Sequence, residues 1–287
     1  MSSKDRQGLT GMDVLMDGIA FGESPRWHDD RVWFSDWGAG RVMSVATDGS
    51  STLEAEVQSF PLCIDFLPDG RLLLVSAAGN EILRREQDAE LVRHADLAPL
   101  ATTPWNDVVV DDHGNAYVNN IGFDFPDGDF APGLVALVTP DGLVRQVADG
   151  LAFPNGMAIT PDGSTLIVAE SYAEQLTAFA IAGDGSLTDR RVWAATPGDH
   201  PDGICLDATG AAWYADVGNR HCVRLREGGE VLDTVSFDRG AFACILSRAG
   251  EPRLFVVGQN YGDADPEDGA TGRLAAFSAP APGAGFP

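Results

Sequence analysis

Short apolar runs separated by polar turns recur along the whole chain. The repeated unit is an apolar strand, a turn that often contains Asp-Gly, and a second apolar strand, which is the pattern of a β-hairpin. The chain has no long amphipathic helical pattern, so the sequence predicts an all-β protein. Six copies of the hairpin pattern are present, and they begin at Ser24, Ile64, Val108, Met157, Ile204 and Cys244.

The spacing of the six copies predicts the architecture. Their turn positions are Arg31, Gly70, Gly114, Gly163, Gly210 and Gly250, separated by 39, 44, 49, 47 and 40 residues. A repeat of about 40 to 50 residues has room for four short strands and is the mark of propeller blades. We therefore expect a six-bladed β-propeller with four-stranded antiparallel blades around a central channel.

A ring of blades has to be closed, because an open ring would leave free sheet edges. We expect residues near Asp13 to Ala20 and Arg273 to Ser278 to share one blade. This divides the chain into a polar N-terminal segment at 1–12, the propeller domain at 13–278 and a Pro/Ala/Gly-rich tail at 279–287. We expect the tail to be loosely held.

Charge and cysteine usage narrow the partners and the compartment. The 43 acidic residues outnumber the 19 lysines and arginines, and the net charge of -24 would repel nucleic acid and anionic membrane surfaces. The N-terminus is polar, and no apolar run of about 18 residues follows it. We expect a soluble cytoplasmic protein that binds neither nucleic acid nor membranes; the oligomeric state is left open.

The cysteines form no CxxC pair and are expected to be reduced packing residues: Cys63, Cys205, Cys222 and Cys244.

One position in each blade is expected to lie near the channel axis, where its side chain could bind a ligand or take part in a reaction. Propeller strands run outward from the channel, so the residue leading into each innermost strand lies near the axis. Counting eight residues back from the six turn positions gives Glu23, Leu62, Asn106, Asn155, Asp202 and Phe242. Four of these six are oxygen donors, two as carboxylates and two as amide carbonyls.

Oxygen donors that converge from four blades suit one hard divalent cation, with water at the remaining coordination positions. Calcium is the first expectation, and magnesium or manganese would suit the same donors. Zinc or iron(II) could also occupy an all-oxygen pocket. The alternative is that Asn and Asp only shape tight turns here. Four donors in one register favour the metal site.

The segments around these donors resemble a known family. Glu23-Ser-Pro, Trp105-Asn-Asp, Phe153-Pro-Asn-Gly and Pro201-Asp-Gly are similar to motifs of the SMP-30/gluconolactonase/luciferin-regenerating (LRE-like) family, and the resemblance spans about Gly22 to Arg273. It implies a six-bladed propeller whose central channel contains one metal, bound by residues matching Glu23, Asn155 and Asp202. Asn106 matches a fourth residue that ligates the metal or contacts substrate.

The resemblance also implies an activity, the opening of a lactone ring. The metal would polarise the carbonyl and activate water, and Asp202 matches the proposed proton acceptor. Many sugar lactonases of the family carry an arginine two residues before the position of Asn106, and this chain has Pro104 there. The substrate is therefore expected to be a small-molecule lactone that is not specified as a sugar.

Side chains in segments expected at the channel mouth are candidates for substrate contact, although ordinary packing explains their aromatic members equally well. Trp37, Phe153 and Tyr261 are further aromatic residues in or near such segments. The candidates for substrate contact are Trp105, Asn106, Asn120, Phe123, His200 and Phe242.

Other functions stay open at this point. The chain has neither a Gly-x-Ser-x-Gly elbow nor a His-Glu-x-x-His pair, so serine-hydrolase and zincin chemistry lack their starting residues. A strictosidine-synthase-like or paraoxonase-like propeller with another reaction is an alternative, as is a non-catalytic binding propeller. The acidic run from Asp263 to Gly269 lacks two residues required of a calcium-binding loop and is expected to be a solvated loop.

Overall fold

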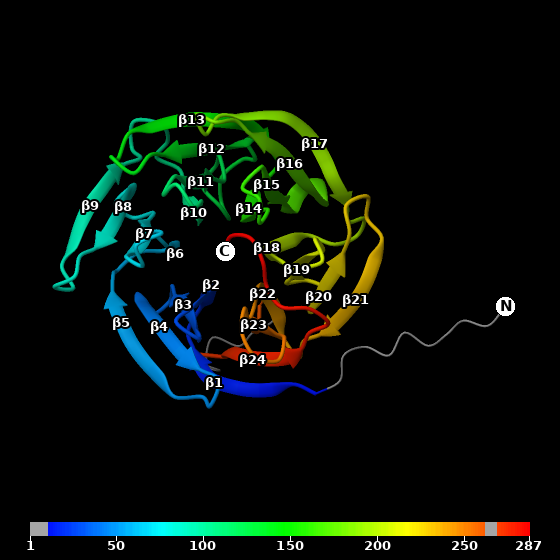
Figure 1. The fold of residues 1–287 in the computed structure, drawn as a ribbon. Helices are drawn as coiled ribbons and strands as arrows, with labels where there is room; N and C mark the ends of the chain where they lie inside the picture. The colour runs from blue at the N-terminus through cyan, green and yellow to red at the C-terminus, as the bar shows by residue number, and fades with distance from the viewer. Residues whose placement is uncertain (1–10, 262–268) are drawn as a thin grey trace.

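Six four-stranded antiparallel sheets are arranged in a ring around a central axis (Figure 1). The structure is a computed structural model that describes residues 11–261 and 269–287. The prediction of an all-β, six-bladed propeller is confirmed. Most of the acidic run from Asp263 to Gly269 lies outside the described residues, as does most of the polar segment 1–12.

Each of the first three blades runs from an innermost strand at the axis to an outermost strand at the rim. Blade 1 contains β2 (Gly22–His28), β3 (Arg31–Asp36), β4 (Arg41–Ala46) and β5 (Ser51–Glu56). Blade 2 contains β6 (Leu62–Phe66), β7 (Leu72–Ser76), β8 (Glu81–Arg85) and β9 (Leu91–Asp96). Blade 3 contains β10 (Trp105–Val110), β11 (Ala116–Asn120), β12 (Gly133–Val138) and β13 (Val144–Leu151).

Blades 4 to 6 follow the same order around the ring. Blade 4 contains β14 (Pro154–Ile159), β15 (Thr165–Glu170), β16 (Gln175–Ile181) and β17 (Leu187–Ala195). Blade 5 contains β18 (Pro201–Leu206), β19 (Ala212–Asp216), β20 (His221–Leu225) and β21 (Val231–Ser236). Blade 6 contains β22 (Gly240–Leu246), β23 (Arg253–Gln259), β24 (Gly272–Ser278) and β1 (Asp13–Ile19).

The ring closes in blade 6, where the first strand of the chain completes a sheet made by its last three strands. β1 pairs antiparallel with β24, with Asp13 opposite Ala276 and Ile19 opposite Gly272. The expectation that residues near 13–20 and 273–278 share a blade is confirmed. β1 thereby covers the outer edge of β24, which would otherwise be free, and joins the two ends of the ring.

Burial falls from the axis to the rim. Every residue of the innermost strand β22 is buried, whereas the outermost strand β5 has no buried residue. The apolar core therefore lies between the faces of neighbouring blades, as expected for strands that are covered on both sides. All four cysteines are buried and free, which agrees with their expected role as packing residues.

The C-terminal tail crosses the face of the ring and ends near the axis (Figure 1). Its backbone is bonded to three blades: Gly283 N donates to Ser247 O at 2.8 Å, Ala284 N to Leu206 O at 3.0 Å and Phe286 N to Ile159 O at 2.9 Å. The prediction of a loosely held tail is wrong. The Pro/Ala/Gly composition suggested weak packing, but the tail is fastened mainly by backbone groups, which composition does not report.

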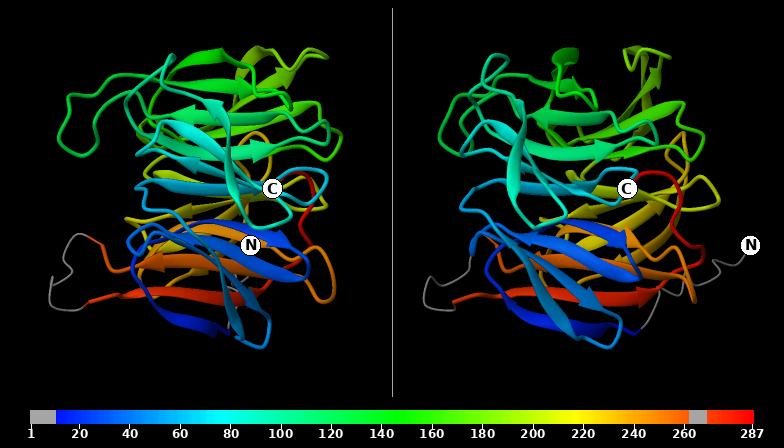
Figure 2. Two further views of the ribbon diagram at one scale, coloured as in Figure 1. Left: turned by 90° about the vertical axis from the view of Figure 1, so that its left-hand side faces the viewer. Right: turned by 60° about the vertical axis from the view of Figure 1, so that its left-hand side comes forward.

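The two faces of the ring carry different segments. The tail lies on one face, and the loop 121–132 between β11 and β12 projects from the opposite face (Figure 2). Helix within the described residues is limited to one short 3-10 turn, η1 (Ser171–Ala173). In this part of the chain, no helix is long and apolar enough to cross a membrane.

Deleting residues 281–287 should lower the free energy of unfolding by about 2 to 4 kcal/mol, because several backbone hydrogen bonds and the packing of Phe286 are lost. Urea denaturation would measure the change. Leu143→Ala serves as the control, since Leu143 is 66% exposed and its loss should change little. A deletion as stable as the full chain would contradict the assignment of the tail to the folded structure.

Candidate metal centre at the propeller axis

The four predicted oxygen donors all lie at the start of innermost strands. Glu23 is in β2, Asn106 in β10, Asn155 in β14 and Asp202 in β18. In each of these strands, pairing with the second strand of the blade shifts register beside the donor. A bulge of this kind turns a side chain away from its regular direction. Of the two strands with an apolar residue at this position, β6 with Leu62 pairs without any shift, whereas β22 also shifts register at Phe242.

Glycines beside two donors let neighbouring innermost strands approach closely. A Cβ atom added to Gly156 would lie 2.5 Å from Ile204 N, and one added to Gly203 would lie 2.3 Å from Ala243 Cβ. Only glycine fits such an approach without a shift of backbone. The Asn155-Gly and Asp202-Gly pairs thus bring blades 4, 5 and 6 together at the axis.

The donors surround a narrow axial pocket. Glu23, Asn106 and Asn155 line it directly, and Asp202 lies beside its lining residue Gly203. Asn106 Nδ2 donates to Asn155 Oδ1 at 3.0 Å, so the two amides from blades 3 and 4 are in contact. Oδ1 of Asp202 is buried and accepts no hydrogen bond from any described residue. A buried carboxylate oxygen without a donor is rare unless a ligand supplies the partner.

Burial and mutual repulsion strongly perturb the two donor carboxyls. The pKa of Glu23 is raised from 4.5 to about 8, chiefly by desolvation and in part by the charge of Asp107, while a hydrogen bond from Ser24 N opposes the shift. Desolvation raises the pKa of Asp202 well above its ordinary value, and the charges of Glu23 and Asp107 act in the same direction. Both carboxyls therefore need a positive charge nearby to be ionised at neutral pH.

Three buried charged residues below the donors were not found from the sequence. Arg26 lies on the axis, donates to Asp107 Oδ1 at 3.0 Å and has its Nε 3.5 Å from Asp65 Oδ1. Asp107 also accepts a hydrogen bond from Met157 N at 2.9 Å, which links blade 3 to blade 4. The blade register could have indicated these residues. Asp107 lies one position after the donor Asn106, and Arg26 and Asp65 lie three positions after the register positions of their own blades.

The donor set fits a divalent cation. Glu23, Asp202, Asp107 and Asp65 place four buried carboxyls near the axis. The charge of Arg26 opposes the rise in the pKa of three of them, and Asp65 also interacts with the charge of Arg248. Two arginines leave an excess of negative charge if all four carboxyls ionise. A cation bound by Glu23, Asn106, Asn155 and Asp202 would offset that excess through the hard oxygen ligands that calcium, magnesium and manganese prefer.

The structure brings some of the predicted substrate contacts to the mouth and buries others. Trp105 is fully buried and packs in the core around blades 2 and 3. Asn120 is also fully buried, and its amide is hydrogen-bonded to Thr103 and Gly122. His200 is exposed, with Nδ1 2.9 Å from Ser171 O. Phe123 and Phe242 each belong to an aromatic cluster described below.

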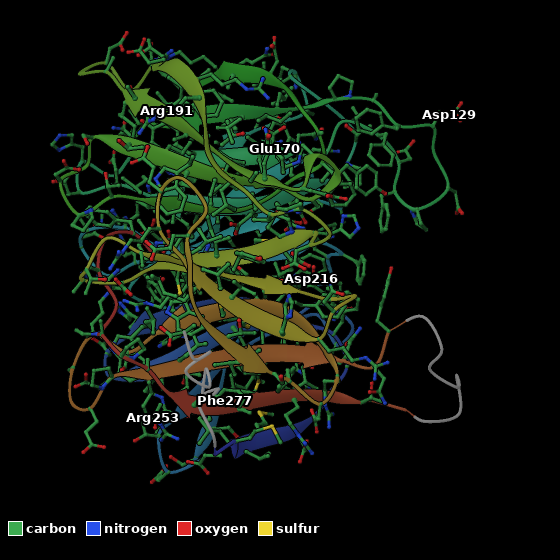
Figure 3. The ribbon with its side chains drawn as sticks, turned by 90° about the vertical axis from the view of Figure 1, so that its right-hand side faces the viewer. Asp129, Glu170, Arg191, Asp216, Arg253 and Phe277 are labelled. Atoms are coloured by element: carbon green, nitrogen blue, oxygen red, sulfur yellow. The ribbon has the colours of Figure 1, made fainter. Side chains whose placement is uncertain are left out.

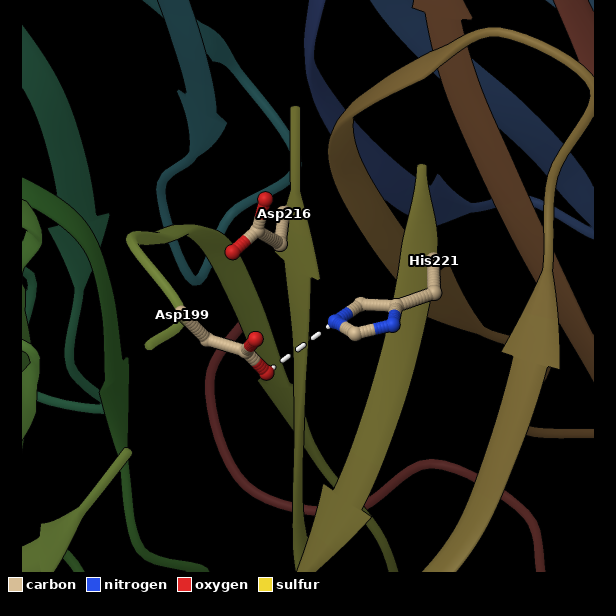
Figure 4. A group of neighbouring side chains, drawn as sticks. All are labelled: Asp199, Asp216 and His221. Carbon is tan, nitrogen blue, oxygen red and sulfur yellow. Dashed lines mark hydrogen bonds and ion pairs between the residues drawn. The ribbon is translucent and has the colours of Figure 1, made fainter. Parts of the chain in front are cut away.

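A second acidic cluster, Asp199, Asp216 and His221, lies in blade 5 (Figure 4). Its carboxylate oxygens already accept hydrogen bonds. Asp216 accepts from the backbone N–H groups of His200 and Asn219, both at 2.7 Å, and Asp199 Oδ2 lies 3.0 Å from His221 Nε2. We therefore interpret this cluster as a set of hydrogen bonds that hold the loop leading to Asp202, not as a metal centre.

Other blades have the same arrangement, in which a carboxylate at the end of the second strand accepts a backbone hydrogen bond. Glu170, the last residue of β15, accepts from Ala152 N at 2.7 Å, and Asp36, the last residue of β3, accepts from Phe21 N at 2.9 Å. Figure 3 labels Glu170 and Asp216, and places Asp216 toward the same face as Asp129 of the loop 121–132. A buried carboxylate at this position holds the segment that enters the innermost strand of its own blade, and thereby positions the donor two or three residues further on.

Comparisons with known proteins agree with the fold. A family model described as the SMP-30/Gluconolactonase/LRE-like region matches residues 21–259. An L-arabinolactonase from Azospirillum brasilense is 24% identical over 249 residues, which cover 85% of this chain and 82% of that protein. A gluconolactonase structure from Xanthomonas campestris has a TM-score of 0.76 at 24% identity, covering 96% of both chains. The structure of a calcium-binding protein, regucalcin, from Agrobacterium tumefaciens has a TM-score of 0.75 at 17% identity, covering 96% of this chain and 95% of that one.

Metal-free protein should lose stability as the pH rises. The folded-state pKa of Glu23, about 8, lies above its ordinary value of 4.5, so the folded protein holds a proton that the unfolded chain releases. The resulting stabilisation is complete below pH 4.5 and is lost as the pH rises through about 8. Urea denaturation of chelator-treated protein at pH 5 and pH 8.5 would measure the loss, and Glu23→Gln should reduce it. A stability that rises between these pH values would contradict the shift.

Arg26→Met should lower the free energy of unfolding by about 3 kcal/mol or more, because it leaves Asp107 and Asp65 buried without their cation. Arg71→Met is the matched control. Its ion pairs with Asp69 and Glu86 lie at the surface, and each should contribute less than about 1 kcal/mol. Equal losses in the two variants, measured by urea denaturation, would show that Arg26 does not compensate the axial carboxyls.

Proposed function

The chain belongs to the SMP-30/gluconolactonase/LRE-like family, and from that premise we propose that it is a metal-dependent lactonase that opens the ring of a small cyclic ester. The observation that carries the proposal is the set of four oxygen donors in one register at the axis. Two of them are carboxyls whose charged forms need a cation, and one of these, Asp202, has a buried oxygen to which no described residue donates a hydrogen bond.

Glu23, Asn106, Asn155 and Asp202 would hold the cation, and calcium is the first expectation because all four offer oxygen. When bound, a divalent cation at this place would polarise the lactone carbonyl and lower the pKa of water. The relative named L-arabinolactonase and the structure titled as a calcium-binding protein support this choice of chemistry.

Asp202 would act as the proton acceptor. Its carboxylate takes a proton from water as the water oxygen bonds to the carbonyl carbon of the lactone. The ring C–O bond then breaks, and Asp202 returns the proton to the departing alkoxide, so the product is an open hydroxy acid. Oδ1 of Asp202 is the available acceptor, because no described residue donates a hydrogen bond to it.

The surroundings of Asp202 hold it ready for this role. The loop before it is fixed by the bond from His200 N to Asp216, and Gly203 packs its strand against blade 6. Such a fixed base keeps the proton acceptor aligned with the attacked carbon, which reduces the reorganisation needed at the transition state.

Asp202→Asn should lower kcat for lactone opening by about a hundredfold or more, since it removes the proton acceptor but keeps the size of the side chain. Glu23→Gln should weaken metal binding and raise the metal concentration needed for half-maximal rate. Asp88→Asn is the control, because Asp88 is exposed in a turn of blade 2.

The assay follows acid release from a panel of lactones, with chelator-treated protein reloaded with one metal at a time. Proteins that hydrolyse no lactone with any metal, or an Asp202→Asn variant with unchanged turnover, would contradict the proposal. Chelation should abolish the activity, and calcium, magnesium or manganese should restore it.

A further inference from the structure

Ten aromatic rings stand in two clusters around the axis. The first, called here the blade-3/4 wall, consists of Phe123, Phe125, Phe130, Phe153 and Tyr172, with neighbouring ring centroids 4.8 to 6.3 Å apart. The second, the blade-6/1 wall, consists of Phe21, Trp37, Phe60, Phe242 and Tyr261, with centroids 5.0 to 5.5 Å apart.

Topology places all ten rings on the donor-bearing face. Each ring lies either at the entry to or the start of an innermost strand, as Phe153 and Phe242 do, or in the segment that follows the second strand of a blade, as Tyr172 does. These strands are antiparallel, so both positions lie at one end of the blade; Pro154 at the start of β14 is paired with Glu170 at the end of β15. The metal donors lie at this same end.

Both walls are continuous with the metal donors. Phe153 precedes Asn155 by two residues, and Phe21 precedes Glu23 by two residues. Phe21 also packs edge to face on Phe242, whose neighbour Ala243 lines the axial pocket. A molecule with its reacting group at the donors therefore has aromatic surface on two sides.

The outer members of each wall are exposed. Phe60 is 59% exposed, Phe130 54%, Tyr261 52% and Tyr172 51%. Exposed aromatic side chains clustered around a candidate site are characteristic of ligand contact, because a ligand can cover the apolar area that the protein leaves in water.

The polar groups beside Pro104 are engaged with one another. The hydroxyl of Thr103 donates to Asn120 Oδ1 at 2.7 Å, and Asn120 Nδ2 donates back to Thr103 O at 2.6 Å. The next residue is Pro104, which offers neither a side-chain donor nor a backbone N–H. This part of the rim is therefore poorly equipped to bind the several hydroxyls of a sugar.

We propose that the substrate is a lactone carrying an aryl group or an alkyl chain, with the ring carbonyl at the axial donors and the apolar substituent against the two walls. This inference takes the reaction, lactone opening, from the proposed function. The preference for an apolar substituent depends only on the two aromatic walls. Aromatic walls stabilise such a substituent by burial of apolar area and by ring stacking. A polyhydroxylated lactone would lose hydrogen bonds to water at the same surface without replacing them.

The first test compares dihydrocoumarin and δ-decalactone with D-glucono-1,5-lactone on the metal-loaded protein. The two apolar lactones should have kcat/KM values at least about tenfold higher. Tyr172→Ala and Phe60→Ala, one in each wall, should each lower kcat/KM for dihydrocoumarin about five- to tenfold, mainly through KM, and change D-glucono-1,5-lactone less than about twofold. Leu143→Ala, an exposed apolar residue in the turn after β12, is the matched control.

A preference for D-glucono-1,5-lactone would overturn the inference and leave the lactonase proposal intact. Equal effects of the wall variants on all three lactones would also overturn it.

A second test separates substrate recognition from the reaction by measuring the binding of 2-tetralone by calorimetry. This ketone has CH2 in place of the ring oxygen of dihydrocoumarin and therefore cannot be hydrolysed. Metal-loaded protein should bind it, and Tyr172→Ala and Phe60→Ala should each weaken binding about fivefold. If no lactone is hydrolysed while 2-tetralone binds in this way, the lactonase proposal fails and the aromatic site stands. If 2-tetralone does not bind, the substrate-class inference is wrong.

Discussion

Like charges buried at the propeller axis are the constraint on which the rest of the structure depends. Carboxylates removed from water cost several kcal/mol each unless a cation or hydrogen-bond donors compensate them. Glu23 and Asp202 have their pKa values raised by this burial, and Arg26 compensates Asp107 and Asp65 beneath them. The ring of blades holds these groups together against their repulsion, and it thereby creates a place where a divalent cation is favoured.

Hydrogen bonds between neighbouring blades involve residues that lie beside the donors. Ser24 Oγ accepts from Ile64 N at 3.0 Å between blades 1 and 2, and Ser171 Oγ donates to Pro201 O at 2.8 Å between blades 4 and 5. Asp107 links blades 3 and 4. These bonds fix the donors within the scaffold, so binding of a cation there would not require loose segments to become ordered.

Much of this could be predicted from the sequence, because the features involved repeat. The turn positions give the number of blades, and the register from those turns leads to Glu23, which lines the axial pocket, and to Asp202, which interacts with the charge of Glu23. Contacts that occur once were missed. The register reaches the position of Arg26, but it does not show that this side chain pairs with carboxyls from two other blades, and the backbone bonds of the tail leave no periodic signal. Trp105 was expected at the mouth, but the bulged start of β10 places its ring in the core.

The central claim is that the four donors form one metal site, and anomalous diffraction from crystals grown with manganese tests it most directly. The account predicts a single strong peak on the axis, within coordination distance of oxygens from Glu23, Asn106, Asn155 and Asp202. A peak at Asp199, Asp216 and His221 with none on the axis would contradict the account. So would an axis that remains without metal at saturating manganese.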